Sequence, residues 1–287
     1  MTGNRKPPGR GKGTSLTESI LFLVILGVGI VFILPFIWMI VVSFERYANI
    51  QPPFPPSFII REPSLFNFKI ILENGIMLRA YRNSFLVAVL NVVVCLGAVL
   101  PGAYALSKGT FRGKNFIALL ILSTMMVPFE TRMIPMFVMF NKVKLTNTFV
   151  PLILPSMLDA FSLFLAKGYF DSLPDSLAES AEIDGAGKFR IFRSIFLPLT
   201  TPILATVVIL RFMGSWNSFL WPRIILTGGK TQTVPLYVSV FIHENGVRLA
   251  GSTMTVAFLG IIPVLIVFLF LQKYIIQSIA LSGLKGE

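Results

Sequence analysis

The chain has 287 residues, of which 54% are hydrophobic and only 13% are charged, and its mean hydropathy is +0.78. A soluble domain carries about 25% charged residues, so this composition excludes an ordinary soluble domain and indicates an integral membrane protein. The net charge of +12 would suggest a nucleic-acid partner in a soluble chain. Because the basic residues flank apolar runs, we expect them to face membrane lipid and set the orientation, and we expect no nucleic-acid partner.

Apolar runs predict the membrane-spanning helices, since one span needs about 20 mostly apolar residues. Three runs contain no charged residue and predict uninterrupted spans: 19–44, 83–107 and 249–272. Ionisable residues interrupt three further runs that are long enough to cross: 115–140, 147–169 and 200–222. The sequence therefore predicts an all-α fold, a polytopic bundle of six transmembrane helices.

The predicted organisation has a basic tail at 1–18, a transmembrane domain at 19–276 and a second tail at 277–287. The first apolar run far exceeds the 7–15 residues of a signal-peptide core, and no small-residue cleavage site follows, so we expect an uncleaved helix. The short segment 108–115 holds three basic residues and no acidic one. By the positive-inside rule, this segment and both termini are expected in the cytoplasm, in a multi-pass protein of the cell (inner) membrane.

The segment 171–200 is the most polar stretch between the predicted spans. Pro174 suits a first helical turn, and Ser172 with Asp175 resembles a capping box, so a short helix is predicted to start here. Gly185 is well placed to end that helix in the left-handed conformation.

A second short helix is predicted after Gly185, with Phe189, Phe192 and Phe196 on one face, and Pro198 is expected to stop it. Two helices joined at a glycine corner make a compact knob suited to a groove on a partner. The alternative is an amphipathic segment that lies on lipid head groups.

This segment resembles the EAA loop of the inner-membrane permeases of binding-protein-dependent ABC importers. The family pattern is EAA, three residues, G, nine residues, I, one residue, LP, and Glu179–Ala181, Gly185 and Ile195–Pro198 match its spacing with Ser180 for the second Ala. Further residues are similar to the carbohydrate-uptake, MalG-like subfamily: Asp184, Ala186, Phe192, Gly214–Asn217, Phe219–Pro222 and Ser282–Gly286.

The resemblance implies a permease subunit that forms half of the translocation pathway for a carbohydrate, an oligosaccharide or related sugar. An extracytoplasmic binding protein would deliver the sugar, and the partners would be a second homologous (MalF-like) permease and two cytoplasmic ATPase subunits. The knob would dock into the ATPase as a coupling helix through Glu179, Ser180, Ala181, Asp184, Gly185, Ala186, Phe189, Arg190, Phe192, Leu197 and Pro198.

The chain itself is expected to be neither an enzyme nor a cofactor-binding protein, with ATP and Mg²⁺ bound by the partner ATPase. Its only P-loop-like fragment is Gly228–Thr231, and Ile224 stands where the motif needs its first glycine. No catalytic motif is recognisable, and Cys95, the single cysteine, is expected to be a packed small residue without a disulfide or metal role.

Candidate pathway residues lie in the interrupted runs, because a charged side chain at membrane depth costs about 2.5–3.5 kcal/mol and usually faces a bundle interior. Asp159 and Arg211 are such candidates, with a site nearer the membrane interface as the alternative. Trp216 and Asn217 offer the stacking and hydrogen bonds that a sugar needs, with core packing as the alternative. Glu130 and Arg132 are expected at a helix end on the outer surface. Local family contacts are in doubt at Ser218 and Arg223, where the family commonly has an acid and an apolar residue.

The loop 242–251 is expected on the outer side, and the resemblance implies that His243, Glu244 and Asn245 contact the binding protein. One histidine with no cysteine nearby gives no metal site. A stand-alone secondary transporter or channel for a small polar solute is the alternative function. Such proteins often contain inverted repeats, and none is evident between 19–140 and 147–276.

Overall fold

The computed structural model describes the backbone of residues 16–51 and 55–283, and the side chains of these residues other than 17, 247 and 271–283. The described chain is helical and contains no strand, only an isolated bridge between Glu45 and Pro63. The predicted all-α fold is therefore confirmed. Most of the predicted basic tail and residues 284–287 lie outside the described ranges.

Four helical segments of the described chain are long and apolar enough to cross a membrane. They are α1 (Leu16–Phe44), α3 (Ile76–Lys108), the broken segment 150–171, and α14 (Ala250–Gly283). Two bent helix pairs would bring the count to six if each pair crosses as one unit, so the predicted number of spans stays a prediction.

The expected third span is not one straight helix. α4 (Lys114–Ser123) continues through the short η1 (Thr124–Met126), and α5 (Phe129–Lys142) then leaves at 98°. The bend follows from Pro128, because proline has no N–H to donate and pushes the preceding residue out of the helical region. Val127 has φ −92° and ψ 112°, which is extended backbone.

The expected fourth span is interrupted in the middle. α6 (Val150–Ile153) and η2 (Leu154–Leu158) precede α7 (Ala160–Asp171), and Asp159 between them is extended. The Asp159 carboxylate accepts a hydrogen bond from the Ser162 N–H at 3.1 Å and so caps α7. Asp159 thus lies at a helix start, where a carboxylate is stabilised by free N–H groups.

The expected fifth span also ends early. α11 (Thr201–Trp216) stops at Asn217, and α12 (Leu220–Ile225) is a separate short helix. α13 (Val234–Asn245) and η4 (Gly246–Leu249) follow. The segment 242–251, predicted as a loop, is therefore mostly helical.

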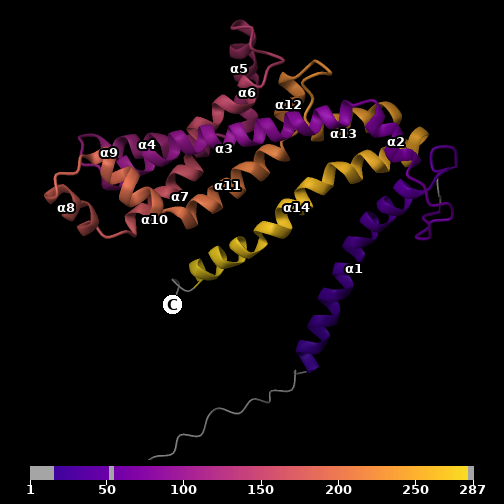
Figure 1. Cartoon of the computed structure of the whole chain (residues 1–287), viewed down its shortest axis with the longest axis horizontal. Helices are drawn as coiled ribbons and strands as arrows, with labels where there is room; N and C mark the ends of the chain where they lie inside the picture. Colours follow the sequence, from indigo (N-terminus) through magenta and orange to yellow (C-terminus); the bar gives the residue numbers. More distant parts are fainter. Residues whose placement is uncertain (1–15, 52–54, 284–287) are drawn as a thin grey trace, which may run out of the picture.

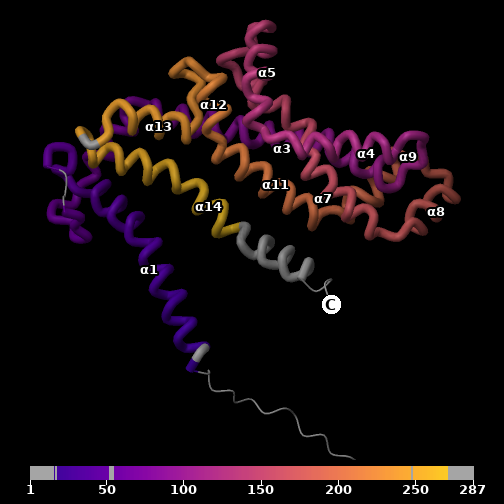
Figure 2. The backbone as a smooth tube through the Cα atoms, turned by 180° about the vertical axis from the view of Figure 1, so that it is seen from behind, coloured from indigo at the N-terminus to yellow at the C-terminus, as the bar shows by residue number. Residues whose placement is uncertain are grey.

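Helix α3 runs along the long axis of the molecule and packs against α7, α11 and η2 (Figure 1). α14 packs against α13 and against the upper half of α1, while the rest of α1 diverges from the bundle (Figures 1 and 2). The apolar side chains of α1 from Ile20 to Phe36 are exposed. Such a surface needs lipid or another membrane subunit to cover it.

Three buried clusters follow α3 from end to end. One joins the first part of α3 to α2 (Phe66–Glu73), α11, α13 and α14 around Trp216, a second joins α5, α6 and α12 around Trp221, and a third joins the last part of α3 to α7 and the segment 173–197. Cys95 is fully buried in this third cluster, which confirms its predicted packing role.

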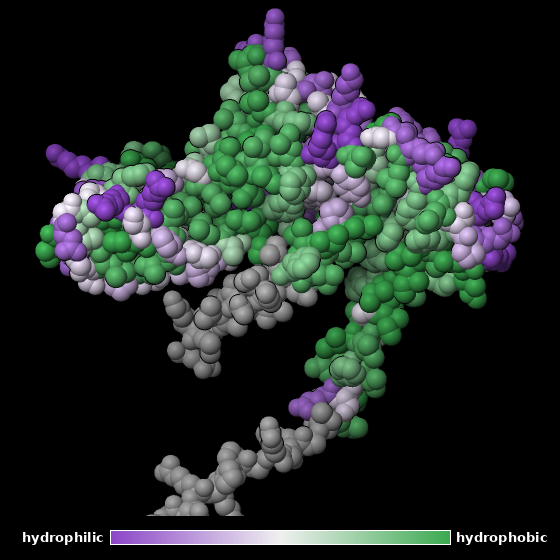
Figure 3. All heavy atoms as spheres, in the orientation of Figure 1, coloured by the Kyte–Doolittle hydropathy of each residue, from purple (hydrophilic) through white to green (hydrophobic). Residues whose placement is uncertain are grey.

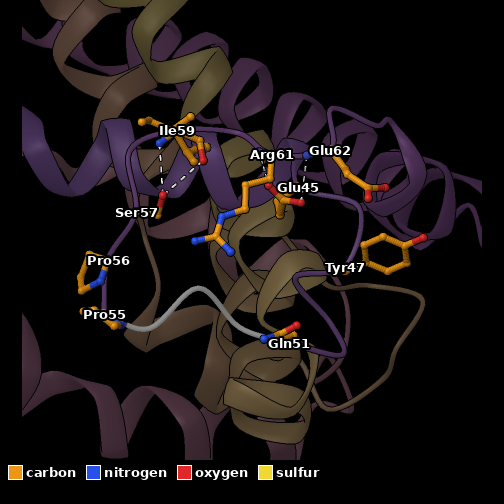
Figure 4. Close-up of a pocket in the computed structure, with 10 residues that line it drawn as sticks. Glu45, Tyr47, Gln51, Pro55, Pro56, Ser57, Ile59, Arg61 and Glu62 are labelled. Carbon is orange, nitrogen blue, oxygen red and sulfur yellow. Dashed lines mark hydrogen bonds between the residues drawn. The ribbon is translucent and has the colours of Figure 1, made fainter.

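The connection between α1 and α2 is anchored by Glu45, as Figure 4 shows. Its carboxylate accepts hydrogen bonds from the N–H groups of Arg61 at 2.8 Å and Glu62 at 3.3 Å. A surface cavity of about 540 Å³ lies beside this turn, lined by Tyr47 and Gln51 among others. The amide of Asn67 then ties α2 to the end of α1 through the Ser43 and Glu45 carbonyls.

Figure 3 shows hydrophobic residues over the middle of one face. Hydrophilic residues gather at the end that carries α8 (Ser176–Ile183) and α9 (Lys188–Ile191) and at the opposite end near α2 and α13. α3 connects these two polar ends. The membrane normal is therefore expected along α3, with a polar cap on each side.

Candidate functional site

A polar cavity of about 340 Å³ opens beside the middle of α3. Apolar residues make most of its wall, including Val87, Leu152 and Met136. Its polar lining consists of Asn91, Arg132, Ser156, Asp159, Arg211, Ser215, Ser218 and Thr233. Polar groups that converge in an otherwise apolar cavity are typical of ligand sites, and in membrane transporters such sites lie near the bilayer midplane.

Asp159 and Arg211, predicted from separate apolar runs, form an ion pair in this cavity. The distance from Arg211 Nη1 to Asp159 Oδ1 is 3.2 Å, and Nη2 of the same guanidinium donates to Asn91 Oδ1 at 3.0 Å. The Asn91 amide in turn donates to the Leu152 carbonyl at 3.0 Å. The network therefore ties α3, the break in 150–171 and α11 together at membrane depth.

Asn91 lines the cavity but was not predicted from the sequence. The sequence indicated this residue only by its polar amide within the uncharged run 83–107. An amide without a hydrogen-bond partner costs free energy when it is buried among apolar residues. The structure supplies the partners: Asn91 uses its amide N–H and its amide oxygen, and its backbone carbonyl accepts from Ser156.

Several polar atoms of the cavity wall have no partner within the described residues. Arg211 Nε and the Thr233 hydroxyl are buried without a hydrogen bond. Arg132 is exposed and forms no ion pair; its guanidinium lies 5.7 Å from the centre of the Phe129 ring on its own helix. Arg132 lies near the start of α5 as predicted, but it also faces the cavity, which the sequence did not indicate.

Trp216 and Asn217 do not line this cavity. Trp216 is 4% exposed and stacks on Phe212 with ring centroids 5.8 Å apart, so it packs the core, the alternative that the sequence left open. Asn217 is exposed where α11 ends. The indole at the cavity belongs to Trp221, whose Nε1 donates to the Pro151 carbonyl at 2.9 Å.

The predicted knob is a helical hairpin, the coupling hairpin, made of α8 (Ser176–Ile183), α9 (Lys188–Ile191), the π turn η3 (Phe192–Phe196) and α10 (Leu197–Leu199). Gly185 has φ +78°, as predicted for the corner. The Ala186 N–H donates to the Ala181 carbonyl and the Gly185 N–H to the Glu182 carbonyl, which is the Schellman pattern of a helix C-terminus.

The predicted capping box at the start of this hairpin is wrong. The Ser172 hydroxyl donates backwards to the Tyr169 carbonyl, and Asp175 makes no capping hydrogen bond. The Asp175 carboxylate instead pairs with Lys108 at 2.6 Å. This cation at the end of α3 competes successfully for the carboxylate, since a charge-assisted bond is stronger than a neutral one.

The base of the coupling hairpin is firmly seated on α3. Phe192 and Phe196 are buried, and the Tyr104 ring packs against both, with centroids 5.1 and 5.2 Å away. The ammonium of Lys108 also donates to the Leu173 carbonyl at 2.6 Å. Ala181 is 8% exposed in the same cluster, so it and Phe192 contact their own chain and do not offer a surface to a partner.

The tip of the coupling hairpin is apolar and uncovered. Ile183 is 87% exposed and Phe189 is 73% exposed, and Glu179 is exposed beside them on α8. The sequence predicted Phe189 on the same face as Phe192 and Phe196. This prediction is wrong, because Phe189 is exposed while the other two are buried. The remaining predicted coupling residues are either exposed (Ser180, Asp184, Gly185, Arg190, Pro198) or half-buried (Ala186, Leu197), and the two half-buried ones pack against the cluster at the hairpin base.

At the opposite end, His243, Glu244 and Asn245 form the last turn of α13. Glu244 and Asn245 border a surface cavity that Arg79 and Lys230 also line. Within the described chain, no three histidine, cysteine or acidic residues are grouped closely enough to hold a metal ion.

The P-loop-like fragment 228–231 is a turn held by Asn147. The amide oxygen of Asn147 accepts from the Gly228 N–H at 2.9 Å and from the Thr231 hydroxyl at 2.6 Å. These donors, which a phosphate-binding loop would offer to its ligand, are therefore used within the chain.

Apolar spanning helices, a polar cavity at the middle of the central helix and a protruding helical hairpin define a membrane transport protein. The chain belongs to the family of binding-protein-dependent transport system inner membrane components, whose family pattern matches residues 74–281. This confirms the resemblance predicted from Glu179–Pro198.

Relatives agree with this assignment over nearly the whole chain. The chain is 36% identical to the arabinooligosaccharides transport system permease AraQ of Halalkalibacterium halodurans, over 79% of this chain and 83% of that protein. It is 31% identical to the trehalose/maltose transport system permease MalG of Thermococcus litoralis, over 95% and 100%. Among solved structures it matches a bacterial ABC transporter involved in import of the acidic polysaccharide alginate, with a TM-score of 0.80, 25% identity and coverage of 93% and 99%.

Proposed function

We propose that this permease subunit forms half of the pathway by which an ABC importer takes up a carbohydrate. An extracytoplasmic binding protein delivers the sugar, a second, MalF-like permease forms the other half, and two ATPase subunits drive the cycle from the cytoplasm. The sugar-transport relatives AraQ and MalG support the substrate class. The charged network of the cavity supports a hydrophilic pathway beside α3.

The coupling hairpin is the observation that carries the proposal. Its base packs against α3, while Ile183 and Phe189 at its tip are 87% and 73% exposed. Exposed apolar side chains with a charged rim are typical of a protein interface. A tip that docks into the ATPase would transmit its movement directly to α3, which also carries Asn91 of the cavity network.

ATP binding and hydrolysis are assigned to the separate ATPase subunits, together with Mg²⁺. In the only P-loop-like turn of the described chain, the Gly228 N–H and the Thr231 hydroxyl are already bonded to Asn147. The opposite end of the molecule, with His243, Glu244 and Asn245, is assigned to the outer side, where it would meet the binding protein. Both termini are then cytoplasmic.

Copurification tests this function directly. A tagged chain, solubilised in mild detergent from its own cell, is expected to bring down an ATPase and a second permease, and the binding protein with sugar is expected to stimulate ATP hydrolysis. A chain that runs alone or as a homo-oligomer would favour a secondary transporter. A ligand screen on the partner binding protein identifies the sugar.

A pair of matched isoleucine variants tests the docking surface. Ile183→Ser on the hairpin tip is expected to reduce recovery of the ATPase, because it removes an apolar contact. Ile59→Ser removes a comparably exposed isoleucine, 76% against 87%, from the connection between α1 and α2, and should not change ATPase recovery. Equal recovery with both variants would contradict the hairpin assignment.

A further inference from the structure

The charges of the cavity do not balance. Arg211 is neutralised by Asp159 at 3.2 Å, whereas Arg132 on the same wall has no acidic partner in the described chain. Its guanidinium is held only by the adjacent Phe129 ring at 5.7 Å. The cavity therefore carries one uncompensated positive charge. Thr233 lines the same cavity, and its buried hydroxyl has no hydrogen-bond partner among the described residues.

The predicted outer side is also rich in positive charge. On the predicted topology it carries eleven basic residues, namely Arg46, Arg61, Lys69, Arg79, Arg82, Arg132, Lys142, Lys144, Arg223, Lys230 and Arg248. It carries only five acidic residues, namely Glu45, Glu62, Glu73, Glu130 and Glu244. Membrane orientation does not require this excess, because orientation is favoured by basic residues on the inner side. A positive entrance raises the local concentration of anions.

We propose that the cavity is a substrate subsite for an anionic sugar, in which Arg132 binds the carboxylate or phosphate group. The planar guanidinium binds either group through two parallel N–H bonds. The Thr233 hydroxyl, after rotation about its Cα–Cβ bond, hydrogen-bonds a sugar hydroxyl and so recovers the free energy lost by its present lack of a partner. The ion pair of Asp159 with Arg211 keeps the second guanidinium in place beside the ligand.

The size of the cavity suits part of a substrate. Its volume of about 340 Å³ is at the small end of ligand pockets, which span about 300–1,000 Å³. One charged unit of an oligosaccharide would therefore lie here, and the rest of the chain would extend toward the second permease. This inference rests on the proposed function, and it specifies the chemistry of its substrate.

Three sugar probes provide the test, two of which differ only at their carboxyl groups. The probes are a uronic-acid oligosaccharide, the same oligosaccharide with its carboxyl groups reduced to alcohols, and a sugar phosphate. The complete importer in lipid nanodiscs, with its binding protein, is assayed for sugar-stimulated ATP hydrolysis with each probe. Stimulation by the uronate or the phosphate distinguishes the two sources of the anionic group.

Two arginine variants separate the subsite from general surface charge. Arg132→Gln is expected to raise the KM for the anionic probe about tenfold, since a bond to a charged group is removed, and Arg132→Lys should restore part of it. Arg223→Gln is the matched control. Arg223 is also exposed and lies 6.0 Å from the ring of Phe219, yet it is not part of the cavity wall.

The outcomes distinguish this inference from the function on which it rests. A neutral sugar that stimulates the wild-type importer as well as its anionic counterpart, or equal KM changes for Arg132→Gln and Arg223→Gln, would overturn the anionic subsite alone. No stimulation by the binding protein with any sugar would contradict the proposed function itself. A KM increase confined to the anionic probe and to Arg132→Gln would support the subsite.

Discussion

Two polar networks along α3 differ in how completely their groups are satisfied within the described chain. At the end of α3, the side chain of Lys108 is 9% exposed, and its ammonium bonds both the Leu173 carbonyl and Asp175 at 2.6 Å. At the middle, Arg211 keeps Nε without a partner and Thr233 keeps its hydroxyl without one. A closed network is suited to transmitting force rigidly, and an open one is suited to binding a ligand, because its groups still have bonds to gain.

This difference assigns separate tasks to one helix. On the proposed function, the coupling hairpin moves with α3, and its base contacts α3 through Tyr104 and Lys108. The proposed cavity accepts and releases a substrate, and a fully satisfied network would leave no hydrogen-bonding groups free for it. Variants that disturb one region and leave the other intact should therefore change either coupling or substrate affinity.

The largest effect is expected at the corner of the coupling hairpin. Gly185→Val places a β-branched residue at φ +78°, which costs about 2 kcal/mol or forces the corner to open. ATP-dependent uptake is expected to be lost while the subunit remains in the membrane. Uptake of labelled sugar and membrane immunoblotting are the measurements.

Gly187→Val is the control for this corner. Gly187 has φ −70° and ψ 155°, and a side chain at either glycine would enter open space. The two variants therefore add the same bulk to the same loop, and only one of them strains the backbone. Equal uptake by both variants would show that the corner geometry does not matter for coupling.

A loss of stability, rather than the loss of uptake expected for Gly185→Val, is expected from breaking the charge pair of the cavity. Asp159→Asn retains a good helix cap but leaves Arg211 without its counter-ion, at a cost of about 2–3 kcal/mol. The thermal unfolding temperature of the purified complex should fall. Adding Arg211→Met should recover part of the fall in unfolding temperature, because the unpaired cation is then removed. If the effects of the two substitutions were instead additive in the double variant, the two residues would not be a coupled pair.

The sequence predicted the helices and the hairpin better than the cavity. Gly185 and the apolar runs were predictable because glycine conformation and lipid burial are local properties. The bend at Pro128 and the break at Asp159 interrupt apolar runs that composition alone reads as continuous. Trp216 and Trp221 lie only five positions apart. The end of α11 between them decides which indole reaches the cavity.

Two neighbouring hydroxyls test whether the open network is a cost in stability. Ser84 is 3% exposed, and its hydroxyl accepts from the Val234 N–H at 2.8 Å. Thr233 directly precedes Val234 in the chain, and its hydroxyl has no partner among the described residues. Ser84→Ala should destabilise the protein by about 1–2 kcal/mol, because it leaves a buried N–H unsatisfied, and Thr233→Val should be neutral or slightly stabilising. Thermal unfolding of both variants in the same detergent measures this, and a larger loss with Thr233→Val would mean that its hydroxyl already has a partner.

The smallest effect is expected at the rim of the closed network. Lys167 pairs with Asp171 one turn away at 2.7 Å, but the two side chains are 25% and 45% exposed, and Asp171 also accepts from the Ser107 hydroxyl at 2.6 Å. A solvent-exposed pair of this kind contributes about 0.3–0.5 kcal/mol, so Lys167→Met should leave the unfolding temperature nearly unchanged. Lys108→Met alters a side chain that is 9% exposed and removes its ammonium, which also lies 5.9 Å from the centre of the Phe196 ring. The fall in unfolding temperature should be several times larger. The shifts in unfolding temperature of the two variants are measured at low and high salt, and their ratio tests whether a buried contact to α3 holds the base of the hairpin. A shift for Lys108→Met as small and as salt-sensitive as that for Lys167→Met would place both lysines in surface pairs.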